Sequence, residues 1–181
     1  MNSPKTEQEI CVNCGFCCDG TLFNHAVLEP GEKGQLPEKM KAGYFKTKTG
    51  EFFRLPCSYF SGKCTIYDQK KAHVCSSFRC KLLKDFSKNR VTQSEAIEIV
   101  QNAMDLREEI RRLHQAVFDT QQVLPFREIL INIGDLEESQ ELELGNNKDF
   151  KLLKIKATIL ETLLIRHFKS KKEFDKMIEN T

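Results

Sequence analysis

The sequence has no long apolar run, no excess of one charge and no secretory leader, and each absence narrows the class of protein. No apolar stretch approaches the roughly 20 residues of a membrane-spanning helix. The 28 basic and 26 acidic residues give a net charge of +2, whereas nucleic-acid binding usually needs a broad basic surface. The first ten residues include acidic side chains and have no apolar core. We therefore expect a cytoplasmic protein with no membrane partner and no nucleic-acid partner.

Recognisable catalytic patterns are lacking too, and histidine is scarce. No Ser-His-Asp set, phosphate-binding loop or paired-carboxylate pattern stands out, so the sequence leaves open whether the chain is an enzyme. Of the four histidines, His73 lies two residues before Cys75, where it can replace one cysteine as a zinc ligand. We expect it instead to lie on the surface, because the cysteines already suffice as ligands. His114 and His167 fall in expected helices, where they face solvent or a packing edge.

Cysteine is concentrated in one region of the chain. All eight cysteines precede residue 81, and they are Cys11, Cys14, Cys17, Cys18, Cys57, Cys64, Cys75 and Cys80. Disulfides seldom persist in the reducing cytosol, and one or two buried cysteines often serve only as small apolar side chains. Eight grouped cysteines are typical of metal binding. The sequence therefore predicts that all eight are ligands of a metal ion or cluster.

The first four cysteines form a dense motif. Cys11, Cys14 and Cys17 can converge from one compact loop, and Gly15 lets that loop turn with a positive φ. The spacing resembles the loop around a [4Fe–4S] cluster in bacterial ferredoxins, although the ferredoxin fourth cysteine with its proline is absent. Adjacent side chains in extended backbone point in opposite directions. Cys17 and Cys18 therefore serve two centres, or one of them is a ligand while the other packs or reacts.

The later four cysteines are spaced widely enough to come from several loops. Eight thiols fill two four-cysteine sites, or one cluster with spare ligands, and the sequence does not choose between them. The first hypothesis is an iron–sulfur centre, such as [4Fe–4S], or another iron centre, with a redox role or an unassigned enzymatic reaction. The alternative is a structural zinc module for protein–protein interaction. Thiolate ligands suit both metals.

The full cysteine pattern resembles a known family. Cys11-x2-Cys14-Gly15-x-Cys17-Cys18 is followed by Pro56-Cys57, Gly62-Lys63-Cys64-Thr65-Ile66-Tyr67 and Cys75-x2-Phe78-x-Cys80. This is similar to the CxxCxxCC family, the YkgJ-like domains named for zinc or iron chelation. The resemblance covers residues 11–83 and implies that all eight cysteines have counterparts there. Where members usually have Arg-Pro before the seventh cysteine, this chain has Lys71-Ala72. One branch, the flagellin lysine methylases, transfers methyl groups from S-adenosylmethionine, but no glycine-rich strand–loop–helix for that cofactor is recognisable here.

Residues 1–83 form the predicted cysteine-rich metal-binding or cluster-binding region, and residues 84–181 form the predicted α-helical region. The first region has weak helical periodicity, with one short strand at 51–55 before Pro56. In the second, Thr92 with Glu95 and Ser170 with Glu173 are capping boxes, and Pro125 begins a short helix. The predicted fold is mainly α, with a small loop-rich cysteine-cluster head packed on the helical C-terminal half.

A long helix is expected at 148–167, and its apolar residues make a wide face. One side of that face consists of Leu152, Ile155, Ile159 and Leu163, and beside them lie Leu153, Leu160 and Leu164. We expect ordinary core there, or a dimer or partner surface if the side proves exposed. The acidic stretch between Gly134 and Gly145 is expected to be a solvated helix face or loop. The basic run after Arg79, which includes Lys81, Lys84, Lys88 and Arg90, is expected to be solvated surface.

Overall fold

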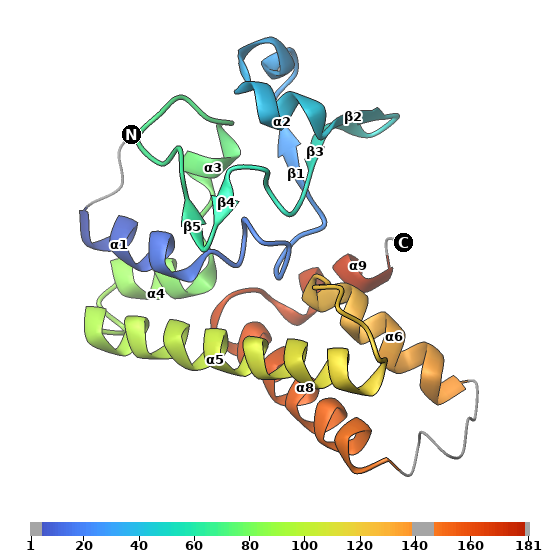
Figure 1. The fold of residues 1–181 in the computed structure, drawn as a ribbon. Coiled ribbons are helices and arrows are strands. Elements are labelled where there is room, and N and C mark those ends of the chain that lie inside the picture. Colours follow the sequence, from blue (N-terminus) through green and yellow to red (C-terminus); the bar gives the residue numbers. More distant parts are fainter. Residues whose placement is uncertain (1–4, 139–146, 180–181) are drawn as a thin grey trace. The chain divides into compact units, whose positions relative to one another are not determined.

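The computed structural model describes residues 5–138 and 147–179. Helices dominate these residues (Figure 1), which confirms the prediction of a mainly α fold. The chain divides into two compact units, Met1–Ile97 and Glu98–Thr181. They are called here the cysteine-rich unit and the helical unit, and the first includes residues 84–97. No helix within the described ranges has both the length and the apolar character to cross a membrane.

The cysteine-rich unit contains a three-stranded antiparallel sheet with β3 at its centre. Its strands are β1 (His25–Leu28), β2 (Tyr44–Thr47) and β3 (Gly50–Arg54), in the order β1-β3-β2. Strand β3 confirms the strand expected at 51–55. Neighbouring residues of a strand face opposite sides of the sheet. Phe53 therefore faces the apolar core, while Phe52 stacks on Phe45 with ring centroids 5.3 Å apart on the other side.

The rest of this unit consists of short elements joined by loops. They are α1 (Lys5–Cys14), the 3₁₀ turn η1 (Glu32–Gln35), α2 (Glu38–Ala42), β4 (Phe60–Ser61), β5 (Lys63–Cys64), α3 (Val74–Ser77) and α4 (Lys81–Ser87). Beneath the sheet lies a small buried core of Leu28, Leu36, Met40, Phe53, Cys57, Ile66 and Ala72. A cysteine is thus part of the apolar core that supports the sheet.

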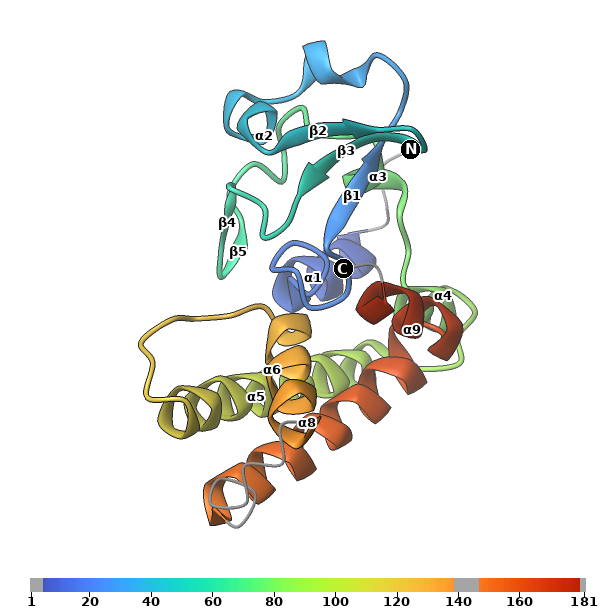
Figure 2. The ribbon, with the colours of Figure 1, turned by 90° about the vertical axis from the view of Figure 1, so that its right-hand side faces the viewer.

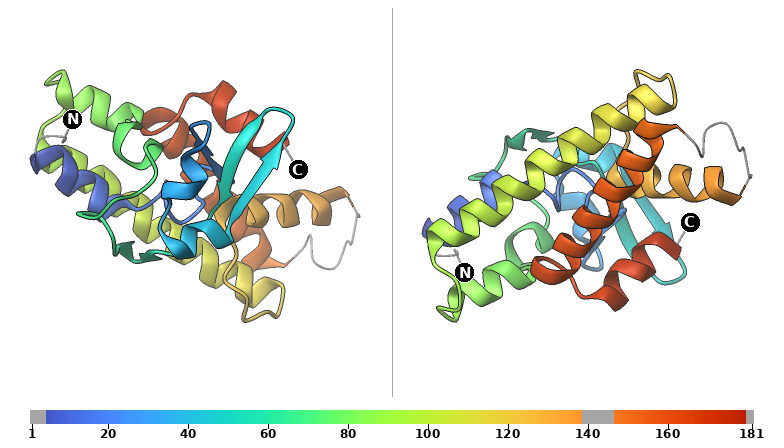
Figure 3. Two further views of the ribbon diagram at one scale, coloured as in Figure 1. Left: turned by 90° about the horizontal axis from the view of Figure 1, so that it is seen from above. Right: turned by 90° about the horizontal axis from the view of Figure 1, so that it is seen from below.

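The helical unit is built from long helices. Helix α5 (Gln93–Val117) begins in the cysteine-rich unit, and α6 (Phe126–Glu138), α8 (Lys148–His167) and α9 (Lys171–Glu179) follow. Helices α5 and α8 cross (Figures 2 and 3), and the Lys156 ammonium pairs with the Glu109 carboxylate between them at 2.6 Å. The fully buried side chains of this unit include Ile110, Phe126, Ile129, Leu153, Leu160, Leu164 and Phe174. These large side chains give the helical unit a core of its own.

The predicted capping boxes are confirmed. The Thr92 N–H donates to the Glu95 carboxylate at 2.7 Å, and the Glu95 N–H donates back to Thr92 Oγ1 at 3.2 Å. At the start of α9, the Ser170 N–H donates to the Glu173 carboxylate at 3.1 Å. Helix α8 has the predicted bounds, and α6 is longer than the short helix expected after Pro125. The acidic stretch begins in α6, and its residues 139–144 lie outside the described residues.

Two expectations for the helical unit were wrong. On α8, Leu152, Ile155 and Ile159 are 40%, 57% and 51% exposed, so this side is not core. The part of the predicted face that is buried contains Leu153, Leu160 and Leu164, and Ala157 lies with them because these positions share one face of a 3.6-residue helix. His114 is also inside the unit, where it stacks on Phe118 at 4.5 Å and hydrogen-bonds to Asn132 at 3.0 Å. A partner surface on the exposed side of α8 stays a prediction.

Candidate metal centre

The first two cysteines lie on a helix rather than in a loop. Helix α1 ends at Cys14, and Cys11 lies three residues earlier, so both thiols are on one helical face. Gly15 then reverses the chain with φ +68°. Its carbonyl oxygen accepts hydrogen bonds from the N–H groups of Cys18 at 2.8 Å and Asp19 at 3.0 Å. This tight turn brings Cys17 and Cys18 close to the end of α1.

Replacing Gly15 with alanine is expected to destabilise this turn strongly. A Cβ there would lie 2.6 Å from Phe60 Cε2. Left-handed backbone costs an L-residue about 1–2 kcal/mol, and forcing extra volume into a packed site adds about 1–3 kcal/mol. Urea unfolding should therefore show a loss of about 2–5 kcal/mol. Gly31→Ala is the matched control, because Gly31 has φ +79° and a Cβ added there would have no other atom within 4 Å. Equal losses in both variants would contradict the packing of Gly15 against Phe60.

Four thiols gather at α1 and α4, and they are called the first thiol group: Cys11, Cys14, Cys17 and Cys80. Helices α1 and α4 are neighbours, and Cys80 immediately precedes α4. Burial raises the pKa of Cys17 most, and repulsion from Cys14, Cys80 and Cys11 raises it further. The pKa of Cys14 is raised by burial and then by Cys80 and Cys11. These mutual repulsions indicate that the four sulfurs lie within range of one another's charge.

The other four thiols form the second thiol group: Cys18, Cys57, Cys64 and Cys75. The Cys57 N–H donates to the Cys18 carbonyl at 2.7 Å. Burial raises the pKa of Cys18, and repulsion from Cys75, Cys64 and Cys57 adds to it in that order. Cys57 belongs to the buried apolar core, with Cys18 and Cys64 packed against it. The second group therefore adjoins the core under the sheet.

The adjacent cysteines Cys17 and Cys18 thus belong to different groups. Cys17 is repelled more strongly by the three other members of the first group than by Cys18, its neighbour in the chain. Cys18 is in turn repelled more strongly by the three other members of the second group than by Cys11. The two groups meet where Cys11 and Cys64 repel each other. Of the alternatives that the sequence leaves open, this arrangement favours two four-cysteine sites in contact.

A cavity of about 240 Å³ lies between the groups. Six of the eight cysteines line it, and they are Cys11, Cys17, Cys18, Cys57, Cys64 and Cys75. Within the described ranges, no three Cys, His, Asp or Glu side chains are grouped closely enough to hold a metal ion. The thiols therefore surround a hollow and do not converge on one point.

Burial keeps these thiols neutral in the protein alone. It raises the pKa of Cys11 to about 11 and that of Cys75 to about 12, although both residues have exposed surface. Both residues line the cavity between the groups and a second cavity beside it. Thiolates are the form that binds metal, so a cation in the hollow would have to stabilise them. The cation Lys71 already lowers the pKa of both residues in part.

Backbone amides also favour the thiolate form. The Phe16 N–H opposes the effect of burial on the pKa of Cys14, and the Tyr59 N–H does so for Cys57. At Cys80, burial raises the pKa, while the N–H groups of Leu83 and Leu82 lower it. These amides act on the sulfur as hydrogen-bond donors that favour its thiolate form. Such amide dipoles are typical of sites that hold negative sulfur.

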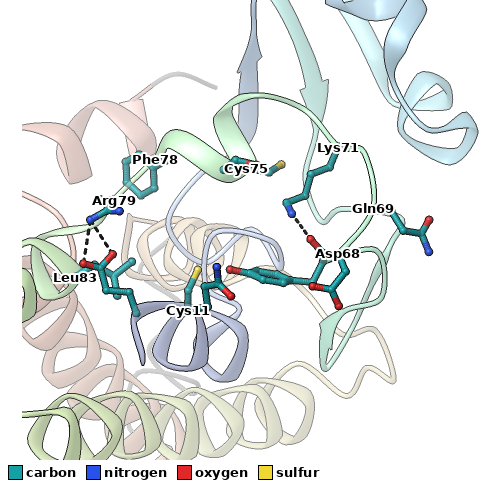
Figure 4. Close-up of a pocket in the computed structure, with 12 residues that line it drawn as sticks. Cys11, Asp68, Gln69, Lys71, Cys75, Phe78, Arg79 and Leu83 are labelled. Carbon is teal, nitrogen blue, oxygen red and sulfur yellow. Dashed lines mark hydrogen bonds and ion pairs between the residues drawn. The ribbon is translucent and has the colours of Figure 1, made fainter. Parts of the chain in front are cut away.

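A second cavity of about 290 Å³, called here the polar pocket, adjoins the thiols (Figure 4). Cys11 and Cys75 lie in its middle, with Arg79 and Phe78 on one side and Lys71 and Asp68 on the other. Glu7, Gln8, Tyr67, Gln69, Ser76 and Leu83 complete its lining. The two thiols also line the first cavity. The polar pocket therefore opens on the edge of the thiol groups.

Charged residues at this edge have defined partners. The Arg79 guanidinium pairs with the Glu7 carboxylate at 2.7 Å, and Glu7 is only 3% exposed. Arg79 was therefore wrongly expected to be part of a solvated basic run. Lys71 donates to the Tyr67 carbonyl oxygen and lies 4.4 Å from the centroid of the Tyr67 ring. The sequence pointed to Lys71 only through the missing Arg-Pro pair, and it gave no signal for Glu7 or Tyr67.

Neither histidine near the cysteines is grouped with three thiols. The His73 ring pairs with the Glu29 carboxylate at 2.9 Å, and His73 does not line the cavity between the thiol groups. His25 does line that cavity, where it packs edge-on against Phe52 with ring centroids 4.7 Å apart. Cysteine is thus the principal candidate ligand type at this site.

Comparison of the chain with protein-family models, with curated proteins and with solved structures finds no match. The function is therefore argued from the chemistry of the site. Three features need a functional explanation: the eight thiols in two adjoining groups, the cavity between the groups, and the polar pocket beside them.

Proposed function

We propose that the protein binds metal through its eight cysteines, as two adjoining thiolate-ligated iron–sulfur centres with a redox or enzymatic role. The observation that carries the proposal is the division of eight thiols into two sets of four at Cys17 and Cys18. Four thiolates are the usual ligand set of a cluster. The similarity of the cysteine pattern to the CxxCxxCC family, which is named for zinc or iron chelation, supports metal binding by these cysteines.

Iron–sulfur centres suit the spacing of the thiols better than single ions. Around one zinc ion the four sulfurs all lie about 2.3 Å from the same metal atom, which would bring them close together. The ligands of a cluster attach to different iron atoms and stand further apart. Six thiols around a cavity of about 240 Å³ match the second arrangement. Contact between the groups at Cys11 and Cys64 favours electron exchange between two centres.

The alternative is a structural zinc module for protein–protein contact. The position of Cys57 in the apolar core favours it, since a closed zinc site there would stabilise the sheet directly. The exposed side of α8 would then be the candidate partner surface. In both cases we propose the reducing cytoplasm as the compartment, because the thiols must escape oxidation. Nucleic acid is not among the proposed partners.

Elemental analysis of anaerobically purified protein tests the proposal. We expect iron with an equivalent amount of acid-labile sulfide, and a brown solution whose colour fades on reduction or oxidation. Zinc without labile sulfide would replace the proposal with the structural alternative. Protein that lacks bound metal and has its cysteines joined in disulfides would contradict both.

Cysteine variants from the two groups should separate one centre from two. Cys14→Ser should remove the centre of the first group and leave the second, so that about half of the metal remains. Cys57→Ser should leave the other half, and the double variant should leave none. Inductively coupled plasma spectrometry on the three proteins measures this. If either single variant loses all of its metal, the eight cysteines hold one centre and the division into two groups is wrong.

A further inference from the structure

Lys71 brings a positive charge to the cavity between the thiol groups. Among the described residues, no other lysine or arginine and no aspartate or glutamate lines that cavity. Apart from the thiols, its lining is mainly apolar and includes Met40 and Phe53. Lys71 also lines the polar pocket, as do Cys11 and Cys75 (Figure 4). A single cation therefore lies at the place where thiols of both groups are found.

The position of this charge is fixed by Tyr67. The Lys71 ammonium group donates to the Tyr67 carbonyl oxygen and lies 4.4 Å from the centroid of the Tyr67 ring. Neither a carbonyl nor an aromatic ring has a net charge, so these contacts restrain the cation without neutralising it. A free surface lysine moves among many rotamers, whereas a restrained one acts on its surroundings from a constant position.

The charge of Lys71 reaches one thiol of each group. Burial raises the pKa of Cys11, in the first group, and of Cys75, in the second, and the attraction of Lys71 lowers both in part. At Cys80, where burial also raises the pKa, the cation that lowers it is Lys84. Lys84 is exposed and does not line the cavity. The geometry and the electrostatics thus agree that Lys71 acts on both groups.

We propose that Lys71 is the counter-ion shared by the two proposed centres and that it raises the reduction potential of both. The inference rests on the proposed metal binding and adds the residue that regulates it. A centre with four thiolate ligands is negatively charged, and reduction adds one more negative charge. A fixed cation therefore stabilises the reduced form more than the oxidised form, most of all where apolar surroundings weaken the screening by water.

The same charge also favours metal binding itself. The empty thiols are neutral, whereas the loaded centre is negatively charged, so Lys71 stabilises the loaded state over the empty one. This second effect does not depend on which metal is bound. It is expected for iron–sulfur centres and for zinc alike.

The experiment is a reductive titration of anaerobic, iron-loaded protein with dithionite, followed by absorbance and by electron paramagnetic resonance. In Lys71→Gln, reduction of each centre should become at least about tenfold less favourable, which is a fall of about 59 mV for one electron. Lys71→Arg keeps the positive charge and should keep both potentials close to those of the wild type. Rescue by arginine separates the effect of the charge from a purely structural role of the side chain.

Two other lysines supply matched controls. Lys70→Gln should leave both potentials unchanged, because Lys70 is exposed and lines neither the cavity between the groups nor the polar pocket. Lys84→Gln should lower the potential of one centre only, and by less, since water screens its exposed charge. An unchanged potential in Lys71→Gln, an equal fall in Lys70→Gln or an equal fall in Lys71→Arg would overturn the inference. A fall confined to one centre would show that the counter-ion is not shared.

Chelator competition on the same proteins covers the case in which Lys71→Gln assembles its centres poorly. Lys71→Gln should hold metal at least about tenfold more weakly than the wild type, while Lys71→Arg and Lys70→Gln hold it equally well. Weak binding in both Lys71 variants would contradict the inference, because the charge would then not be the cause.

Metal analysis separates the two proposals. Wild-type protein with full iron content and an unaltered Lys71→Gln contradicts only the role of Lys71. Wild-type protein with zinc replaces the iron–sulfur centres and removes the effect on reduction, and chelator competition then decides whether Lys71 is a counter-ion. Wild-type protein without metal contradicts the metal centre and the counter-ion together.

Discussion

Removal of the proposed metal is expected to unfold the cysteine-rich unit and to leave the helical unit folded. Structural zinc in zinc-finger peptides contributes an apparent free energy of about 10–16 kcal/mol, which matches or exceeds the whole stability of an ordinary domain. The apolar core under the sheet has seven side chains, and one of them is Cys57. That core is too small to hold three short strands and several loops without the centre.

The helical unit does not depend on the thiols in this way. Its core consists of large side chains such as Phe126, Ile129 and Leu160, all buried, and the Ser170–Glu173 box caps α9. Helices with a packed apolar face keep their structure without metal. The two units should therefore respond differently to one treatment.

Hydrogen exchange followed by mass spectrometry can measure this difference. After anaerobic chelation, amides of residues 25–28 and 50–54 should exchange at the rate of an unfolded chain, while those of 98–117 and 148–167 keep their protection. The experiment works for iron or for zinc. Protected strands in metal-free protein would mean that the apolar core suffices and that the centre has no structural role.

Replacement of Arg79 by leucine should destabilise the cysteine-rich unit by about 3–5 kcal/mol, the usual result of leaving a buried charge unpaired. The Glu7 side chain is only 4% exposed, and its Oε2 atom accepts no hydrogen bond with regular geometry although it lies 2.7 Å from the guanidinium. Without Arg79, the carboxylate would stay buried with no compensating cation. Urea unfolding of the metal-loaded protein measures the loss.

Two further variants control this result. Arg90→Leu breaks the Arg90–Asp85 pair, in which the arginine is 64% exposed, and solvated pairs contribute about 0–1 kcal/mol. In the double variant Glu7→Leu with Arg79→Leu, no charge remains buried, so most of the stability should return. If Arg79→Leu costs no more than Arg90→Leu, the Glu7–Arg79 pair has no structural importance.

The sequence was sufficient for features that depend on local interactions. Both capping boxes involve residues three apart, and the apolar periodicity of 148–167 is contained in one helix, so the bounds of α8 were correct. The strand before Pro56 was identified by its own residues in the same way. The mainly α fold follows from such local signals, since helices in the second half contain most of the regular structure.

Features that depend on distant contacts could not be predicted. Glu7 and Arg79 are 72 residues apart in the sequence, and no local sequence pattern indicates that they pair. The division of the cysteines was left open for the same reason, because Cys80 joins the first group only through the neighbouring positions of α1 and α4. The wide apolar face of α8 was predicted, but its buried part could not be told from its exposed part, because the periodicity of one helix does not show which side packs against the other helices.

The order of the cysteines along the chain has a consequence for synthesis on the ribosome. The first group needs Cys80 and the second needs Cys75, so on the proposed grouping neither centre can be completed while the N-terminal thiols are emerging. Cys11, Cys14, Cys17 and Cys18 must wait, reduced and unligated, until about 60 more residues have left the exit tunnel. Metal insertion is then a late event of translation, and oxidation of the nascent chain competes with it.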